Sequence, residues 1–232
     1  MRAVIFDMDG LMIDSEKIYW AVGRQMAREF GKTVSDETLG QMMGRAPIES
    51  VTLYRNALGL SDSPEKLLET REARVERQMQ GGVEPMPGLY EAIELLRPQF
   101  KLAIATSAPG RFLNVVLDKL RLREYFAALQ TSDDIKHGKP DPEIYLKVIG
   151  KLGVAADECF VLEDSSNGAR AGKRAGAYVI AVPTEHTRAQ DFGFVDYIAA
   201  NLADAAQQVR SVAKRDPQAQ RKRAAGADGE EL

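Results

Sequence analysis

Two carboxylates separated by one residue follow an apolar run near the start of the sequence. Ala3–Phe6 is apolar throughout, and Asp7, Asp9 and Gly10 come after it. In a strand, residues two apart point to the same side, so Asp7 and Asp9 can face one pocket. Carboxylates that close repel each other, and a cation between them relieves the repulsion. An ordinary strand followed by an acidic turn is the alternative interpretation.

Donors suited to phosphate follow later in the chain. Thr106 and Ser107 come after a second apolar run, where hydroxyl and backbone N–H groups can donate hydrogen bonds to phosphate oxygens. Lys139 precedes a proline, which restricts it to an extended backbone. A helix capped by Asp141 is predicted to begin at Pro142. Lys139 is therefore a cation on stiff backbone, suited to a phosphate or a carboxylate cluster.

Another apolar strand ends in two adjacent carboxylates, Glu163 and Asp164. Adjacent strand residues point to opposite sides, so one carboxylate can bind a metal directly while the other acts through water. Ser165 or Ser166 is predicted to cap the helix that follows. Gly168 is the first of three glycines at four-residue spacing, which predict close helix packing rather than phosphate contact.

The charges of these motifs do not balance. Four carboxylates and one lysine leave a net charge of −3 before any phosphate arrives, counting Asp7, Asp9, Glu163, Asp164 and Lys139. Open parallel sheets bind ligands outside the carboxyl ends of their strands, where these motifs are expected. Hard oxygen ligands favour Mg²⁺ over softer metals. The sequence therefore predicts a Mg²⁺ site.

Short strands alternate with helical segments, which predicts an α/β fold with a doubly wound, Rossmann-like parallel sheet. The strands predicted after the first are 101–106, 127–130, 159–162, 178–182 and, from a weaker pattern, 197–198. Residues 1–14 and 86–212 are predicted to form the catalytic core. Residues 213–232 have little apolar content and are predicted to be a disordered tail.

The segment between the two parts of the core has helical patterns only, and residues 15–85 are predicted to form an inserted helical cap. Ser63 and Pro64 supply an N-cap and a first-turn proline for one of its helices. The chain enters the cap near Asp14 and leaves it through a glycine- and proline-rich segment, 81–88. Two closely placed crossings can form a hinge, which a lid over an active site requires. A rigidly packed subdomain is the alternative.

Composition limits the class of protein. The chain has 232 residues, of which 44% are hydrophobic, and a net charge of −3. This favours a globular protein whose partners are small molecules rather than nucleic acid or a membrane surface. No apolar stretch reaches about 18 residues, so we expect a cytoplasmic protein without a membrane span. Cys159 lies in an apolar run and is predicted to be buried.

The order of these motifs resembles the haloacid dehalogenase superfamily, in particular its β-phosphoglucomutase-like and sugar-phosphate phosphatase branch with a small helical cap. The resemblance covers residues 1 to about 205 and rests on Asp7-Met8-Asp9-Gly10, Thr106, Lys139 and Glu163-Asp164. It implies that Asp7 attacks phosphorus and becomes an aspartyl phosphate. It also implies that Asp9 protonates the leaving oxygen and then activates water.

The resemblance implies roles for the other motif residues as well. The implied metal-binding set is Asp7, Asp9, Glu163 and Asp164, and the implied phosphate-binding set is Thr106, Ser107 and Lys139. Arg45 lies in a segment similar to the family's substrate-contacting cap loop and is a candidate anchor for substrate polar groups. A solvated arginine is the alternative. Leu11 replaces a threonine or valine common at its position, a departure that some phosphatases of this branch share.

The predicted function is a Mg²⁺-dependent phosphatase that hydrolyses a small phosphomonoester, such as a sugar, polyol or nucleoside phosphate. A sugar phosphomutase is the enzymatic alternative, although Tyr19 stands where β-phosphoglucomutase carries a histidine. A phosphoacceptor switch module is the non-enzymatic alternative, because receiver domains also combine an acidic pocket with a lysine. The expected partner is a small phosphorylated metabolite, and the chain is expected to be a monomer or a small homo-oligomer.

Overall fold

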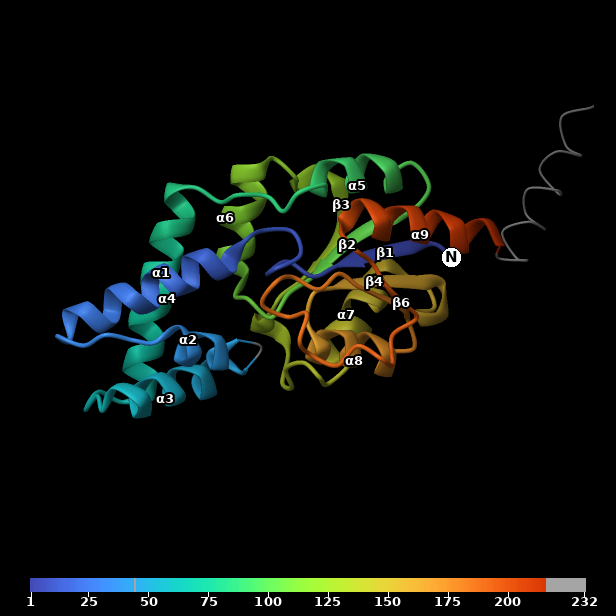
Figure 1. Cartoon of the computed structure of the whole chain (residues 1–232). Coiled ribbons are helices and arrows are strands. Elements are labelled where there is room, and N and C mark those ends of the chain that lie inside the picture. Colours follow the sequence, from blue (N-terminus) through green and yellow to red (C-terminus); the bar gives the residue numbers. More distant parts are fainter. Residues whose placement is uncertain (44, 216–232) are drawn as a thin grey trace, which may run out of the picture.

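The computed structural model describes residues 1–43 and 45–215 of the chain. These residues form a parallel six-stranded sheet of order β3-β2-β1-β4-β5-β6 (Figure 1). The strands are β1 (Ala3–Phe6), β2 (Lys101–Ala105), β3 (Phe126–Gln130), β4 (Cys159–Glu163), β5 (Tyr178–Ala181) and β6 (Tyr197–Ile198). The predicted doubly wound α/β fold is confirmed, and each predicted strand differs from the observed one by at most one residue at one end.

Helices cover both faces of the sheet (Figure 1). One face packs against α5 (Leu89–Leu96), α6 (Gly110–Leu120) and α9 (Leu202–Arg215). The other face packs against α7 (Glu143–Leu152) and α8 (Ser166–Arg174). Short 3₁₀ turns at Arg123–Tyr125, Ser132–Asp134 and Ala156–Glu158 complete the connections.

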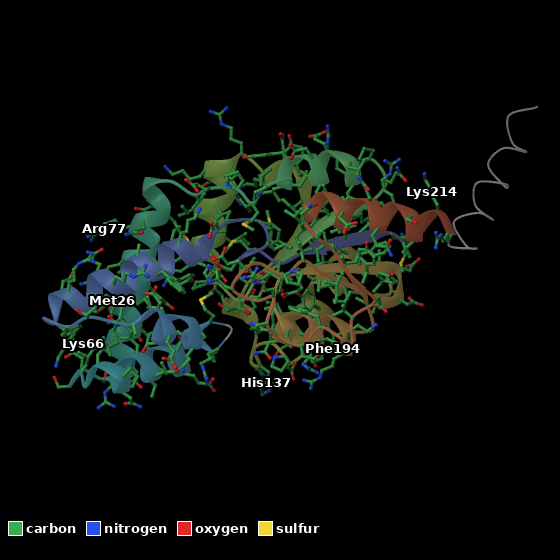
Figure 2. The ribbon with its side chains drawn as sticks, in the orientation of Figure 1. Met26, Lys66, Arg77, His137, Phe194 and Lys214 are labelled. Atoms are coloured by element: carbon green, nitrogen blue, oxygen red, sulfur yellow. The ribbon has the colours of Figure 1, made fainter. Side chains whose placement is uncertain are left out.

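Four helices between β1 and β2 lie together to one side of the sheet (Figure 1). They are α1 (Ser15–Glu29), α2 (Asp36–Met42), α3 (Pro47–Leu58) and α4 (Pro64–Gly81). The predicted start of α4 is confirmed, because Ser63 Oγ accepts a hydrogen bond from Lys66 N at 3.3 Å and Pro64 opens the helix. Met26 of α1 is buried in this helical group, whereas Lys66 is exposed (Figure 2).

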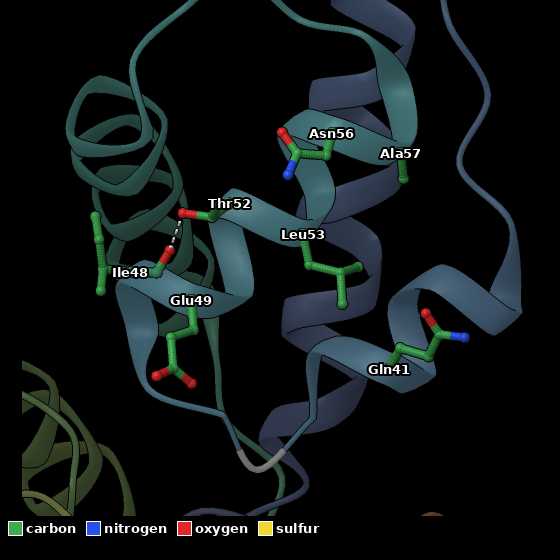
Figure 3. A pocket seen from close by; sticks show the side chains of 7 residues that line it. All are labelled: Gln41, Ile48, Glu49, Thr52, Leu53, Asn56 and Ala57. Carbon is green, nitrogen blue, oxygen red and sulfur yellow. Dashed lines mark hydrogen bonds between the residues drawn. The ribbon is translucent and has the colours of Figure 1, made fainter.

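An open hollow of about 640 Å³ lies between α2 and α3 (Figure 3). It is lined by Gln41 from α2 and by a face of α3 that runs from Ile48 to Ala57. None of the residues predicted for the phosphate or metal site lines it.

The two crossings between this helical group and the sheet lie side by side. The backbone N–H of Asp14 donates to the carbonyl of Glu84 at 3.2 Å, and the N–H of Met86 donates to the carbonyl of Met12 at 2.9 Å. Lys17 Nζ adds ion pairs to Asp14 at 2.8 Å and to Glu84 at 3.5 Å. The chain therefore enters and leaves the helical group through one paired segment, the arrangement that a hinge requires. Motion about it stays a prediction.

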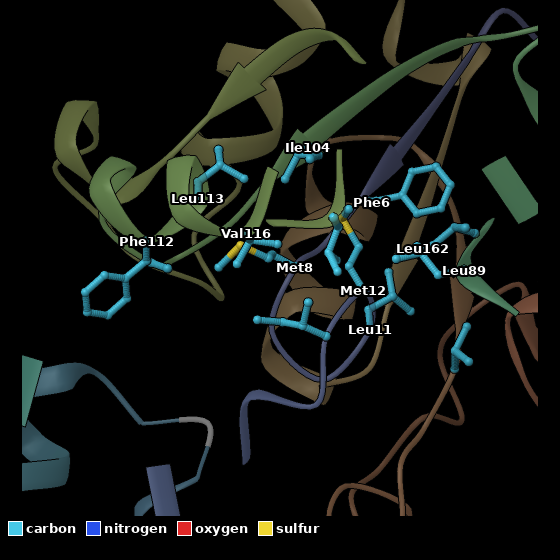
Figure 4. Close-up of a cluster of buried hydrophobic side chains, with 14 of the residues drawn as sticks. Phe6, Met8, Leu11, Met12, Leu89, Ile104, Phe112, Leu113, Val116 and Leu162 are labelled. Atoms are coloured by element: carbon cyan, nitrogen blue, oxygen red, sulfur yellow. The ribbon is translucent and has the colours of Figure 1, made fainter. Parts of the chain in front are cut away.

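The apolar residues next to the two opening aspartates anchor their backbone in the core. Met8 is fully buried, and Leu11 is 1% exposed in the same cluster (Figure 4). Because Met8 points into the core, its neighbours Asp7 and Asp9 point the other way. Burial of Leu11 also accounts for an apolar residue at that position.

The helix after Lys139 begins one residue later than predicted. It starts at Glu143, and Pro142 is its N-cap residue rather than its first residue. Asp141 still contributes a cap-like bond, because its Oδ1 accepts from Glu143 N at 2.9 Å. The loop that carries Lys139 is therefore joined firmly to the start of α7.

Several smaller predictions are also resolved. Cys159 is buried, as predicted. Helix α9 extends to Arg215, past the predicted start of the tail at residue 213. The remainder of the predicted tail, 216–232, lies outside the described residues. Across residues 1–43 and 45–215, no helix combines the length and the apolar character needed to cross a membrane.

Candidate active site

The two carboxylate motifs meet because β1 and β4 are neighbours in the sheet. The register pairs Phe6 with Leu162, and the backbone N–H of Asp7 donates to the carbonyl of Leu162 at 3.0 Å. Both motifs therefore leave the sheet at its carboxyl edge, side by side. Carboxylate oxygens of Asp7, Glu163 and Asp164 lie within 4.8 Å of one another. Residues more than 150 positions apart in the sequence thus form one acidic cluster.

Lys139 supplies a cation to this cluster. Its Nζ donates to Asp7 Oδ1 at 2.5 Å and to Glu163 Oε1 at 2.6 Å, and also to the carbonyl of Ala105 at 3.2 Å. The side chain is only 8% exposed. Burial alone lowers the pKa of Lys139, but the charges of Asp7 and Glu163 outweigh burial and hold that pKa well above its ordinary value. Lys139 is therefore a permanently charged link between the two motifs.

The carboxylate of Glu163 is fully occupied by protein donors. Oε1 accepts from Lys139 and, at 2.7 Å, from the Tyr145 hydroxyl. Oε2 accepts from the backbone N–H of Ser165 at 3.2 Å and from its hydroxyl at 3.0 Å. Four hydrogen bonds use the acceptor capacity of a carboxylate. Glu163 is thus arranged to position Lys139, in addition to lying within the acidic cluster.

Helix α8 comes very close to Glu163 at its first turn. Ser165 is the N-cap of α8, as predicted, and its Oγ accepts from Gly168 N at 3.2 Å. A Cβ at position 168 would overlap the carboxylate of Glu163. A Cβ at Gly172 would lie within 2.9 Å of Val179. These two glycines allow the close packing predicted for them.

Two other carboxylates in the cluster retain unused acceptors. Asp164 accepts no hydrogen bond and forms no ion pair within residues 1–43 and 45–215, and only Oδ1 of Asp7 is engaged. Burial raises the pKa of Asp7 to about 8 against the charge of Lys139. Burial and the charges of Glu163 and Asp7 hold the pKa of Asp164 well above its ordinary value. A divalent cation is what such crowded, underused carboxylates lack.

The donor set fits Mg²⁺. Hard carboxylate oxygens of Asp7 and Asp164 are available, and such ligands suit Mg²⁺ better than softer metals. Gly10 has φ +75°, and a Cβ there would overlap the Asp164 carboxylate. Only glycine at this position both makes the turn and leaves the carboxylate in place.

Asp9 lies beside the cluster with a different set of contacts. The Thr106 hydroxyl donates to Asp9 Oδ2 at 3.2 Å and accepts from Ala108 N at 3.0 Å. Asp9 Oδ1 is buried and has no hydrogen-bond partner among the described residues. Burial raises the pKa of Asp9, against the hydrogen bond from the Thr106 hydroxyl. A carboxyl group with a raised pKa and an unused oxygen is suited to holding and donating a proton.

Two predicted site residues lie outside this network. Ser107 is exposed at the carboxyl end of β2. Arg45 is exposed, and its Nε donates to the carbonyl of Gln41 at 2.6 Å, within the helical group itself. The structure thus brings together Asp7, Asp9, Thr106, Lys139, Glu163 and Asp164 but not these two.

Sequence reasoning missed Tyr145. It lies on the buried face of α7 beside Ile144 and Val148, and its hydroxyl reaches Glu163. A tyrosine on an apolar helical stripe usually needs a partner for its hydroxyl when it is buried. That need is the signal the sequence carried.

Glu16 is a buried carboxylate at the start of α1. It is 5% exposed, and its Oε2 lies 3.2 Å from Nε2 of His186, which belongs to the loop after β5. Burial, together with the charges of Asp14, Glu185 and Asp9, raises the pKa of Glu16 to about 7. The folded protein therefore keeps a proton on Glu16 that the unfolded chain releases near pH 4.5.

The Glu16→Gln variant is expected to flatten the pH dependence of stability. Because the folded state binds more protons than the unfolded state between about pH 4.5 and 7, the free energy of unfolding of the unaltered protein falls as pH rises through that window. Glutamine does not titrate, so the variant gains stability relative to the unaltered protein at about pH 8 but not at about pH 5. Thermal unfolding between these two pH values measures the difference. Parallel curves for the two proteins would contradict it.

The parallel sheet is typical of a class of hydrolases, and the sequence matches the same class. Residues 4–182 match the haloacid dehalogenase-like hydrolases, and the chain belongs to that family. It is 37% identical over 177 residues to the phosphorylated carbohydrates phosphatase of Thermotoga maritima, a match that covers 76% of this chain and 82% of the relative. It is 33% identical over 187 residues to hexitol phosphatase B of Escherichia coli, covering 78% and 83% respectively.

A solved structure agrees with these matches. A protein of Thermotoga maritima, provisionally named a β-phosphoglucomutase, superposes with a TM-score of 0.76 at 31% identity. The superposition covers 91% of this chain and all of the other. Phosphatases and a protein named as a mutase are therefore both among its relatives.

Proposed function

We propose that the chain is a Mg²⁺-dependent phosphatase that hydrolyses a small phosphomonoester through an aspartyl phosphate on Asp7. The observation that carries the proposal is the link between Lys139, Asp7 and Glu163 beside the unused oxygens of Asp164. The names of the phosphatase relatives support the reaction class and a sugar or polyol phosphate as substrate.

In the proposed reaction Asp7 is the nucleophile. A carboxylate oxygen of Asp7 forms a bond to phosphorus as the bond between phosphorus and the leaving oxygen breaks. Asp9 gives its proton to that oxygen, so the substrate leaves as an alcohol. Asp9 then takes a proton from water, whose oxygen attacks phosphorus and releases inorganic phosphate from Asp7.

The other residues of the site stabilise charge or orient the reacting groups. Lys139 is held close enough to Asp7 to stabilise the oxygens of a phosphoryl group attached there. Thr106 orients Asp9 through its hydroxyl. Asp7 and Asp164 would hold Mg²⁺, with Glu163 orienting Lys139 and the backbone carbonyl of Asp9 as a further ligand. When bound, Mg²⁺ would neutralise the repulsion between the carboxylates and the phosphate.

We also propose that the four-helix group, residues 15–85, is a cap over this site and that the protein works in the cytoplasm. The paired crossings at Asp14 and Glu84 support a cap that moves as a unit. Arg45 stays a prediction for substrate contact, as does Ser107 for phosphate.

Removal of divalent metal is expected to stop phosphate release. After treatment with EDTA, the rate with p-nitrophenyl phosphate should fall by about 100-fold or more, since the metal supplies several kcal/mol of charge stabilisation. Added Mg²⁺ should restore the rate, and Ca²⁺ should restore less, because it is larger and bound less rigidly. The measurement is phosphate release in metal-free buffer. Full activity of protein shown to be free of metal would contradict the proposed cofactor.

The mutase alternative has its own test. The assay supplies β-glucose 1-phosphate with a glucose bisphosphate activator and follows glucose 6-phosphate and inorganic phosphate together. We expect inorganic phosphate to exceed the isomerised sugar. Isomerisation that outpaces phosphate release would replace the phosphatase proposal with the mutase.

A further inference from the structure

An arginine interrupts the apolar stripe of the longest cap helix. The buried residues of α4 are Leu67, Arg71, Val75 and Met79, each four positions after the last. Arg71 is 9% exposed, so its charge is largely removed from water. Helical spacing of this kind normally carries apolar side chains, and an arginine there needs a specific reason.

Arg71 forms no ion pair with a carboxylate within the described part of the chain. Its Nη1 donates to Ser50 Oγ at 3.0 Å, and its guanidinium carbon lies 5.7 Å from the centre of the Tyr19 ring. Its Nε is buried with no hydrogen-bond partner among the described residues. Glu72, the carboxylate whose charge acts on Arg71, is bound by Arg111 of α6, which also reaches Glu76 at 3.2 Å.

Burial without a paired anion destabilises this cation. Burial lowers the pKa of the Arg71 guanidinium. A buried charge that lacks a partner costs free energy, and fully satisfied apolar packing is often more stable. The folded protein therefore carries an unbalanced positive charge that an incoming anion would neutralise.

Tyr19 connects this charge to the catalytic side. It lies on α1 with its ring under the guanidinium of Arg71, and burial together with the charge of Asp9 raises the pKa of its hydroxyl. Tyr19 lies in the first turns of α1, which begins at Ser15, six residues after Asp9, and Glu72 next to Arg71 is bound by Arg111 in the first turn of α6, five residues after Thr106. A group on the leaving portion of the substrate would approach this pair.

We propose that Arg71 is a specificity-determining residue that binds a second oxyanion, a carboxylate or another phosphate, on the leaving portion of the substrate. The planar guanidinium has donors in the fork geometry that matches carboxylate and phosphate oxygens. Tyr19 and Ser50 hold that group in place. The inference rests on the proposed phosphatase function and narrows its substrates to phosphomonoesters with an additional negative group.

The test compares matched substrates. In the first pair, glycerol 3-phosphate carries a hydroxymethyl group where 3-phosphoglycerate carries a carboxylate. In the second pair, fructose 1,6-bisphosphate carries a second phosphate that fructose 1-phosphate lacks. The variants are Arg71→Met, which keeps an unbranched apolar stem and removes the guanidinium with its charge, and Arg77→Met, the same change at another arginine of the same helix (Figure 2). The quantity measured is the ratio of kcat/KM within each pair.

In the unaltered protein and in Arg77→Met, kcat/KM should be higher for the substrate with the second anion in at least one of the two pairs. The pair that shows this preference identifies the bound group as a carboxylate or a phosphate. In Arg71→Met that ratio should fall by about 10- to 100-fold, the size of one or two charge-assisted hydrogen bonds. Equal losses on both members of a pair would overturn the inference, as would an unaltered protein that prefers the neutral substrates.

Thermal unfolding separates a structural role from a binding role. Without substrate, Arg71→Met should have an unchanged or higher Tm, because an unpaired buried charge is replaced by an apolar side chain. A lower Tm with equal losses on all substrates would make Arg71 structural and overturn the inference. If no substrate is hydrolysed at all, the phosphatase proposal fails, while a rise in Tm with 3-phosphoglycerate or fructose 1,6-bisphosphate that Arg71→Met abolishes would still support the oxyanion site.

Discussion

Replacement of Asp7 by asparagine is expected to reduce Mg²⁺-dependent phosphate release by about 1,000-fold or more. The amide has nearly the shape of the carboxylate but is not a nucleophile, so no bond to phosphorus forms. The fold should survive, because the amide oxygen of the new side chain can still accept the hydrogen bond that Lys139 now gives to Asp7 Oδ1 at 2.5 Å. Phosphate release from p-nitrophenyl phosphate, together with thermal unfolding of the same sample, checks both expectations.

The matched control is Asp157→Asn, the same chemical change far from the acidic cluster, in the 3₁₀ turn before β4. It should leave phosphate release unchanged. An Asp7→Asn protein that remains folded and still turns over substrate would show that Asp7 is not the nucleophile. A stable phosphoprotein that releases no phosphate from the unaltered chain would instead favour the phosphoacceptor switch.

Replacement of Lys139 by methionine is expected to have a large effect on both stability and rate. Asp7 and Glu163 would lose the buried ammonium that bonds to both, and breaking a buried pair from one side costs about 3–5 kcal/mol. The rate should fall by about 100- to 1,000-fold, as when one preorganised donor is removed from a charged transition state. Unfolding in EDTA and steady-state kinetics with Mg²⁺ measure the two effects separately.

The loss of stability in Lys139→Met should depend on pH. The pKa of Asp7 is about 8 with the lysine in place and rises further without it, so at about pH 5 Asp7 is protonated in both folded proteins, whereas at about pH 9 the unaltered protein gains from an ionised Asp7 that the variant lacks and the loss of stability is larger. Lys136→Met, in the same loop, serves as the control and should match the unaltered protein. A stability loss of equal size at both pH values would show that the ion pairs at Lys139 are not its cause.

The sequence predicted where the site lies because each motif stands at the end of a strand or, like Lys139, in the loop beyond one. In a parallel sheet those ends share one edge, so the local pattern around Asp7, Thr106 and Glu163 was enough to predict their meeting. The family resemblance added roles that strand patterns alone do not specify. It did not show how Glu163 and Asp164 differ. Protein donors occupy the Glu163 carboxylate fully, whereas the Asp164 oxygens accept no hydrogen bond among the described residues.

What the sequence did not reveal depends on contacts between distant elements. Nothing local to Tyr145 shows that its hydroxyl meets Glu163, and nothing local to Glu16 shows that His186 reaches it from a loop 170 positions later. Arg45 had a recognisable motif around it yet donates to backbone within its own helical group. Arg71 had no motif, and only its position in the stripe of α4 signalled its burial.

The position of β1 inside the sheet determines when during protein synthesis the sheet can form. Among the strands of this sheet, β1 comes first in the sequence and lies between β2 and β4, so its pairing on both edges is complete only when the chain has been synthesised past residue 162. Asp7 can meet Glu163 and Asp164 only after these two residues have been synthesised, so no shorter nascent chain can assemble the acidic cluster. The four helices between β1 and β2 pack mostly against one another and against α6, all of which precede β4 in the chain. During synthesis the four-helix group can therefore take shape before the acidic cluster exists.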